Sequence, residues 1–153
     1  VTEWLDRHGF QGPLIVMGRS LGSASAIELA HAHPDRVSGL IIESGFAYVA
    51  PLLRRLGIDP AAVGFRDDEE STFRHIEKIG SWRKSLLVIH GEYDQIIPFS
   101  DGQALFDACP SLSKHLLRIQ GADHNNLFLR GLDDYLAAVG RLASACSGLP
   151  QSS

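Results

Sequence analysis

The chain has 153 residues, of which 44% are hydrophobic and 21% are charged. This composition fits one folded domain with a sizeable core and excludes a disordered tail. Lys and Arg number 14 against 18 Asp and Glu, and no segment gathers the basic residues into a stripe, so we expect no nucleic-acid partner. Apolar runs such as residues 14–17 and 86–89 are far shorter than the ~20 residues of a membrane-spanning helix. We therefore expect no membrane span.

Cysteine and histidine usage bears on location and on metals. Cys109 and Cys146 are too few and too unpatterned for a disulfide framework or a metal site. They favour a reducing compartment, and we expect a cytoplasmic protein. Among the histidines only His31 and His33 are close in sequence. Residues two apart do not share a helix face, so we expect no metal.

Strand-like and helix-like segments alternate along the chain, which predicts βαβ units and a parallel sheet. We expect four strands, at residues 14–17, 37–42, 86–90 and 115–119. Ser100 followed by Gln103 predicts a capping box for the helix that carries Leu105. The last helix has one apolar face, formed by Leu132, Tyr135, Leu136, Val139, Leu142 and Ala143. The fold class is therefore α/β, a mostly parallel sheet of about four strands flanked by helices.

The domain organisation follows from where this alternation is interrupted. Residues 1–146 are expected to form a single domain, with residues 147–153 as a flexible tail. Residues 45–85 are less regular and are expected to form a small cap-like excursion over the sheet edge. This excursion contains helical patterns at 48–56 and 72–79, separated by an acidic run at 67–70.

Residues 18–22 read Gly-Arg-Ser-Leu-Gly and lie between a predicted strand and a predicted helix. This is the setting of a Gly-x-Ser-x-Gly nucleophile elbow. So sharp a turn strains Ser20, and we expect Gly18 and Gly22 to remove Cβ atoms that would collide. The Ser20 hydroxyl would be exposed, and the Leu21 N–H would point toward an oxyanion. The alternative is a glycine-rich turn with an ordinary helix-terminal serine, and the pattern alone does not decide between them.

A serine nucleophile needs a histidine and an acid, in the chain order Ser, Asp or Glu, His. Asp94 follows the third predicted strand and His124 follows the fourth, so both lie at the carboxyl edge of the sheet. Taken singly, Asp94 reads as a cap and His124 as an exposed loop residue. The residue types, their order along the chain and their positions after strands together favour a catalytic set of Ser20, Asp94 and His124.

Three other acids and one other histidine are alternatives for these roles. Asp123 adjoins His124 in a tight loop, Asp101 lies in the first turn of a helix, and Glu43 follows the second strand. The chain-order rule favours Asp94 over all three. His90 reads as a packed residue at the end of a strand, not as a second base.

Three sequence segments resemble motifs of a known family: residues 17–22, 89–98 and 121–125. They resemble the α/β-hydrolase superfamily, and specifically its small-cap serine hydrolases of the peptidase-like, esterase-like and depalmitoylase-like branch. The resemblance implies Ser20 as nucleophile, His124 as general base and then acid, and Asp94 as the carboxylate that orients His124. It also implies an oxyanion donor in the N–H of Leu21.

The family sheet normally has eight strands, and a second oxyanion donor comes from the loop after the third. Only the four C-terminal strands are found here, so we expect the C-terminal part of a longer hydrolase. The strand at 14–17 would then be an open edge through which the chain can self-associate.

The leading hypothesis is a serine hydrolase that cleaves an ester, thioester or amide of a small-molecule or acyl substrate through an acyl-Ser20 intermediate, with no cofactor. The alternative is a non-catalytic binding domain of the same fold, or an inactive fragment of a longer hydrolase. A third hypothesis is a lyase-like or haloperoxidase-like member. Serine at position 20 disfavours the dehalogenase and epoxide-hydrolase chemistries, which need a carboxylate nucleophile.

The substrate is the least determined feature. Residues 45–85 should form one wall of the site, with the acidic run as a candidate rim. Candidate acyl contacts are Phe46, Tyr48, Leu52, Leu53 and Phe65. We favour the alternative that the aromatic residues are core and that the acidic run is a solvated face.

Overall fold

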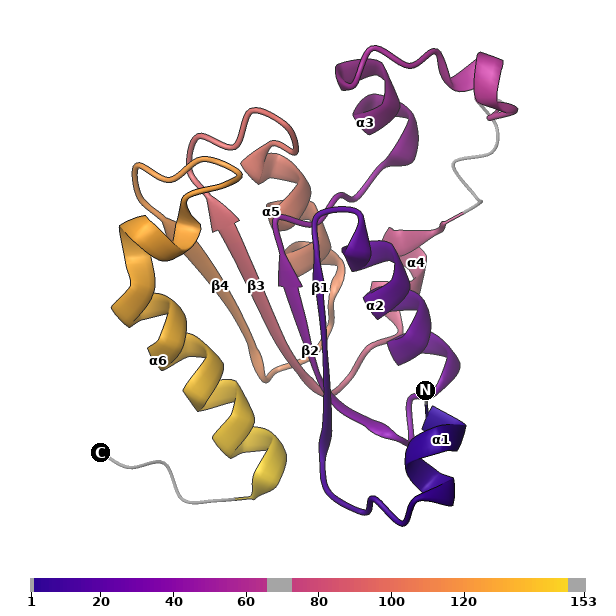
Figure 1. Ribbon diagram of the computed structural model, residues 1–153, viewed down its shortest axis with the longest axis vertical. Coiled ribbons are helices and arrows are strands. Elements are labelled where there is room, and N and C mark those ends of the chain that lie inside the picture. The colour runs from indigo at the N-terminus through magenta and orange to yellow at the C-terminus, as the bar shows by residue number, and fades with distance from the viewer. Residues whose placement is uncertain (1, 66–72, 149–153) are drawn as a thin grey trace.

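The computed structural model describes residues 2–65 and 73–148, and its strands form one sheet with helices on both faces (Figure 1). The elements in chain order are α1 (Thr2–Arg7), β1 (Leu14–Arg19), α2 (Gly22–Ala32), β2 (Val37–Glu43), α3 (Val49–Arg55), the 3-10 helix η1 (Pro60–Val63), α4 (His75–Gly80), β3 (Ser85–Gly91), α5 (Phe99–Ala108), β4 (Lys114–Ile119) and α6 (Leu127–Ser147). All four expected strands are present, and each is one or two residues longer than expected.

The strands lie in the order β1-β2-β3-β4, and every neighbouring pair is parallel. The predicted α/β class and the parallel sheet are therefore confirmed. The strand ends are also in register: Arg19 pairs with Glu43, Glu43 with Ile89, and Gly91 with Ile119. Because parallel strands all point the same way, the loops after the four strands meet at one edge of the sheet.

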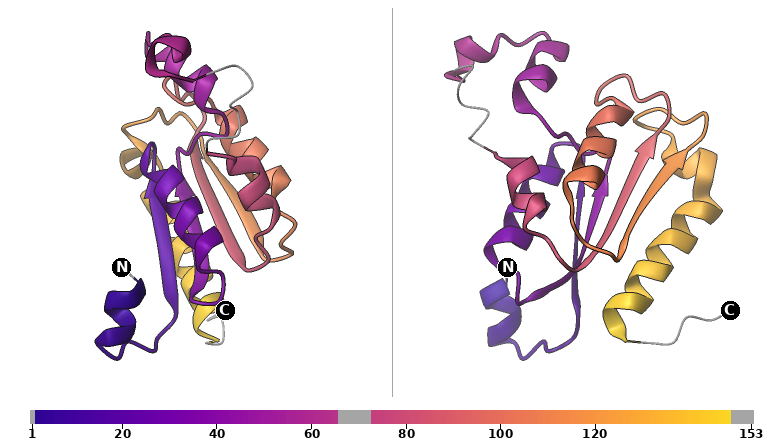
Figure 2. Two further views of the ribbon diagram at one scale, coloured as in Figure 1. Left: turned by 90° about the vertical axis from the view of Figure 1, so that its right-hand side faces the viewer. Right: turned by 180° about the vertical axis from the view of Figure 1, so that it is seen from behind.

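Apolar strand residues alternate between two cores, one on each face of the sheet. Helices α2, α4 and α5 cover one face, and α6 covers the other (Figure 2). The first core contains Ile27, Leu40, Ile42, Ile79, Leu86, Val88 and Leu105. The second contains Ile41, Leu87, Ile89, Tyr135, Ala138 and Leu142. The sheet is thus packed on both faces.

Strand β1 forms an edge of the sheet (Figure 1). Its residues are less buried than those of β2 and β3, and Met17 keeps 47% of its surface exposed. An apolar edge strand is a template for pairing with another strand.

The segment between β2 and β3 leaves the sheet and returns. Helices α3 and η1 lie beyond the carboxyl edge of the sheet, at the top of Figure 1, whereas α4 packs beside α2 and α5. The two expected helices are found as α3, which is one residue shorter at each end than expected, and as α4, which begins at His75 and ends one residue later than expected, at Gly80. The acidic run at 67–70 lies outside the described residues.

Two helix ends differ from expectation. Helix α5 begins at Phe99 after Pro98, and no side chain caps it, so the predicted capping box at Ser100 is wrong. The fixed φ of Pro98, −66°, starts the helix early enough to put Ser100 inside its first turn.

Helix α6 continues through Ser147, and Gly148 closes it with a φ of 65°. Of the expected tail at 147–153, residues 149–153 lie outside the described residues. Within residues 2–65 and 73–148, no helix is both long and apolar enough to cross a bilayer.

Candidate active site

The turn from β1 into α2 holds Ser20 in a strained conformation. Its φ is 52°, in the left-handed region that residues with a side chain seldom adopt. The Ser20 N–H donates to the carbonyl of Glu43 at 2.9 Å, which ties the turn to the end of β2. These features are those expected of a nucleophile elbow.

Only one of the two elbow glycines is required by close packing. A Cβ on Gly18 would lie 2.4 Å from the Gly22 carbonyl oxygen and 2.7 Å from the Ala26 Cβ. A Cβ on Gly22 would meet nothing within 4 Å. The expectation that both glycines prevent a collision therefore holds for Gly18 and is wrong for Gly22, whose Cβ would point into open space.

Ser20, His124 and Asp94 form a hydrogen-bonded chain at the carboxyl edge of the sheet. The Nε2 atom of His124 lies 3.1 Å from Ser20 Oγ, and its Nδ1 atom lies 2.7 Å from Asp94 Oδ2. Because a carboxylate only accepts hydrogen bonds, Nδ1 carries the proton and Nε2 presents its lone pair to the serine hydroxyl. The structure thus brings together the three residues that the sequence singled out.

Asp94 is fixed by its own loop. Its Oδ1 atom accepts hydrogen bonds from the N–H groups of Ile96, at 3.0 Å, and Ile97, at 2.8 Å. Its other oxygen, Oδ2, faces His124 Nδ1 and also lies 3.5 Å from His90 Nε2, and the residue is almost completely buried. The carboxylate therefore has a defined direction.

The three competing acids have other partners. Asp123 accepts from the Asn125 N–H and from the Asn126 side chain, within its own loop. Asp101 accepts from the Ala47 N–H at 2.9 Å, and burial raises the pKa of its carboxyl group. None of these contacts reaches the imidazole, which agrees with the choice of Asp94.

Glu43, the third competing acid, pairs with Arg19 instead of with His124. From the sequence, Glu43 is only a rival of Asp94, and Arg19 has no predicted role. A signal was nevertheless available. An acid and a base at the carboxyl ends of two neighbouring parallel strands are expected to meet when the strands are in register.

His90 is a packed residue at the end of β3, as expected. Its Nε2 donates to the carbonyl of Ile97 at 2.9 Å, and a Cβ on Gly102 would lie 2.4 Å from its ring. Burial lowers the pKa of His90, so the ring is neutral. It supports the loop that carries Asp94.

Leu21 lies between Ser20 and helix α2, with a φ of −58°. Amides at the start of a helix have no acceptor within the helix, and the helix dipole favours negative charge there. The Leu21 N–H is thus a suitable donor to an oxygen that becomes negative beside Ser20.

The candidate acyl contacts are not equivalent. Phe46 and Leu52 are buried against Ile97 in a small core of their own. The ring of Phe65 stacks on Phe73 at 6.3 Å, whereas Tyr48 remains 40% exposed. The preferred interpretation, that the aromatics are core, therefore holds for Phe46.

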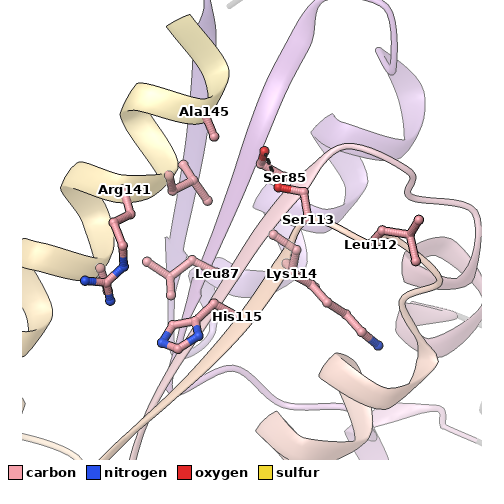
Figure 3. Close-up of a pocket in the computed structure, with 11 residues that line it drawn as sticks. Ser85, Leu87, Leu112, Ser113, Lys114, His115, Arg141 and Ala145 are labelled. Atoms are coloured by element: carbon pink, nitrogen blue, oxygen red, sulfur yellow. Dashed lines mark hydrogen bonds between the residues drawn. The ribbon is translucent and has the colours of Figure 1, made fainter. Parts of the chain in front are cut away.

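A cavity of about 220 Å³ lies away from this site (Figure 3). It is lined by the amino-terminal ends of β3 and β4, including Ser85 and Lys114, and by Arg141 of α6. None of the residues Ser20, Asp94 and His124 lines it. In the part of the chain that the structure describes, no three His, Cys, Asp or Glu side chains are grouped to hold a metal ion.

Comparison with known proteins places the chain in a superfamily. No family model matches it. It is 31% identical over 120 residues to an alpha/beta hydrolase domain-containing protein 17C from Mus musculus. The aligned region covers 76% of this chain and 33% of the relative. The chain belongs to the α/β-hydrolase superfamily. It spans about a third of the length of the curated relatives it matches.

Solved α/β-hydrolase structures share the fold. The esterase domain of a Rhodothermus marinus protein has a TM-score of 0.69 and 22% identity, covering 92% of this chain and 64% of that one. A monoacylglycerol lipase from Paleococcus ferrophilus has a TM-score of 0.67 and 20% identity, covering 94% and 74%. At these identities the likeness concerns the arrangement of the sheet and helices.

Proposed function

We propose that the chain carries the catalytic groups of a serine hydrolase that cleaves a carboxylic ester, thioester or amide through an acyl-Ser20 intermediate. The observation that carries this proposal is the continuous chain from Ser20 Oγ to His124 at 3.1 Å and from His124 to Asp94 at 2.7 Å. Nucleophile, base and orienting acid are thus within hydrogen-bond reach of each other. The esterase and lipase titles of the structural neighbours agree with this reaction class.

The proposed reaction has two halves. In the first, His124 Nε2 takes the hydroxyl proton of Ser20 while Oγ bonds to the substrate carbonyl carbon. The resulting oxyanion accepts a hydrogen bond from the Leu21 N–H. The bond to the leaving group then breaks, and Nε2 returns the proton to that group. In the second half, water attacks the acyl-Ser20 carbon by the same steps and regenerates the hydroxyl.

Asp94 acts throughout by holding the imidazole. Its bond to Nδ1 fixes the tautomer in which Nε2 is the base, and its negative charge stabilises the imidazolium formed in each half. Every proton in this sequence is carried by a side chain of this protein or by water, so the mechanism requires no cofactor.

Replacing the nucleophile tests the proposal. Ser20→Ala should reduce kcat for p-nitrophenyl esters by about 10⁶, as in another serine hydrolase fold. Ser25→Ala is a matched control, because Ser25 is an exposed serine on the neighbouring helix α2. Turnover by Ser20→Ala at the wild-type rate would refute the nucleophile assignment.

The length of the preferred acyl chain can be determined with substrates of different lengths. We propose that Tyr48, Leu53 and Phe65, which lie on the segment beyond the carboxyl edge, are the candidate contacts that remain after Phe46 and Leu52 are assigned to a core. A panel of p-nitrophenyl esters of increasing chain length separates a short-acyl esterase from a thioesterase-like or lipase-like enzyme.

The thiols support a proposal for location. Cys109 and Cys146 are both free, and each donates a hydrogen bond to a backbone carbonyl, of Trp82 and Ser38 respectively. We propose that the protein works in a reducing compartment such as the cytoplasm.

A further inference from the structure

A buried carboxylate lies next to the proposed nucleophile and takes no part in the mechanism described above. Glu43, the last residue of β2, is only 5% exposed. Its Oε1 accepts from Arg19 Nε at 2.9 Å, and its Oε2 accepts from the Tyr135 hydroxyl at 2.6 Å. Burying a charge costs free energy unless it is paired and hydrogen-bonded, and here both oxygens have a partner.

Arg19 connects this carboxylate to the proposed base. While Nε binds Glu43, Nη2 donates to the main-chain carbonyl of His124 at 2.6 Å. The same Nη2 lies 3.5 Å from the Asn125 side-chain oxygen, in the same loop. One guanidinium thus spans from β2 to the loop between β4 and α6.

The nucleophile is held from the same point. The main-chain carbonyl of Glu43 accepts the Ser20 N–H at 2.9 Å, and Arg19 directly precedes Ser20. Glu43 therefore holds the serine through its backbone and the histidine loop through its side chain and Arg19. A shift of Glu43 would change the position of Ser20 relative to His124.

We infer that Arg19 and Glu43 are positioning residues that set the distance between Ser20 and His124, and that Tyr135 of α6 fixes the direction of the Glu43 carboxylate. This inference rests on the proposed function, and it adds three residues that do not touch the reacting atoms.

The chemistry of each group suits this role. A guanidinium is planar, and its separate N–H groups can bind a carboxylate and a carbonyl at once, which an ammonium on a flexible stem does less well. Burial and the Glu43 carboxylate raise the pKa of the Tyr135 phenol, so it stays protonated and donates.

The test compares Arg19→Met and Arg19→Lys with Arg118→Met in the full chain. Arg118 is a matched control because it also pairs with a glutamate, Glu92 at 2.8 Å, at the carboxyl end of a strand. Its exposure, 51%, is close to the 46% of Arg19. Neither Arg118 nor Glu92 is hydrogen-bonded to Ser20 or His124 in the described structure, and Glu92 reaches the His124 loop at Gly121, whose N–H it accepts at 2.9 Å.

Two readouts separate positioning from folding. The first is the downfield NMR resonance of the proton between His124 Nδ1 and Asp94. The second is the division of the kinetic effect between kcat and KM for a short p-nitrophenyl ester. A misplacement of about 1 Å can cost about 10²-fold in rate. We expect Arg19→Met to broaden the resonance and to lower kcat about 10- to 100-fold, with KM within twofold of wild type.

Arg19→Lys keeps the charge beside Glu43, so it should fold even if the Met variant does not. It should still lower kcat about 10-fold, because one ammonium cannot reproduce both contacts. Tyr135→Phe should have a smaller effect of the same kind, and Arg118→Met should change neither readout. An unchanged resonance together with kcat within twofold of wild type in Arg19→Lys would overturn the inference.

Failure of the proposed function would be recognised separately. If wild-type protein does not turn over esters or react at Ser20, the hydrolase proposal fails, and the His124 resonance alone decides the positioning role. If wild type is active and the Arg19 variants match it, the function stands and the inference is wrong.

Discussion

Gly18 and Ala26 approach so closely that a methyl group on Gly18 would lie 2.7 Å from the Ala26 Cβ. The end of β1 and the second turn of α2 therefore pack backbone against side chain. This contact sets the direction in which the helix leaves Ser20.

The first prediction concerns this contact. Gly18→Ala should lower the free energy of unfolding by about 1–3 kcal/mol, the usual cost of overpacking a tight core. Gly22→Ala should be tolerated, because its Cβ would meet nothing within 4 Å. Urea unfolding of the two variants measures the difference. Equal losses of unfolding free energy in both would contradict the conclusion that Gly18 is tightly packed and Gly22 is not.

The second prediction separates the acids. Asp94→Asn should lower kcat by about 10³–10⁴, because an amide no longer selects the tautomer with its proton on Nδ1. Asp101 is a half-buried aspartate that accepts from the Ala47 N–H instead, so Asp101→Asn should leave kcat within a few fold. If Asp101→Asn were the more damaging variant, the assignment of the acid would be wrong.

The third prediction concerns pH. Burial lowers the pKa of both His75 and His90 below the ordinary value of 6.5. The unfolded chain therefore binds more protons below about pH 6.5, and the free energy of unfolding should fall as pH falls through that value. The raised pKa of Asp101 has the opposite effect on the free energy of unfolding. It acts at lower pH, near the ordinary pKa of 3.8 for this group.

Urea titrations at pH 7.5 and pH 5.5 measure this slope. His75→Gln and His90→Gln should each flatten it, since a glutamine does not titrate. Wild-type protein with equal stability at the two pH values would show that these histidines do not control acid sensitivity.

The fourth prediction concerns the edge strand. We propose that the 153-residue chain self-associates through β1, and that Met17→Lys weakens this association by placing a charge on the exposed edge. Sedimentation velocity at increasing concentration provides the measurement. A wild-type chain that stays monomeric throughout would refute the proposal.

Much of the fold follows from local patterns. Buried parallel strands read as continuous apolar runs, so residues 37–42 and 86–90 could be placed nearly to the residue. The spacing of apolar residues in α6 correctly placed Tyr135 and Leu142 in a core. It missed Ala138, and it was wrong for Leu132 and Leu136, which are 43% and 54% exposed. The elbow, the acid and the histidine could be found because each follows a strand in a fixed chain order.

The remaining features depend on contacts that no local pattern contains. The role of Glu43 requires knowing that β1 and β2 are neighbours in register and that α6 brings Tyr135 above them. The difference between Gly18 and Gly22 depends on which side of the turn Ala26 and the Gly22 carbonyl occupy. The predicted start of α5 at Ser100 is wrong because Pro98 begins the helix one residue earlier, at Phe99.

The central claim is that Ser20 is a nucleophile activated by His124 and Asp94. Its most direct test is reaction of the protein with a fluorophosphonate, followed by mass spectrometry of the peptide that contains residues 18–22. We expect one phosphonyl adduct, located on Ser20, which is lost in Ser20→Ala and forms more slowly in Asp94→Asn. An adduct on another residue, or equal labelling of wild type and Ser20→Ala, would contradict it.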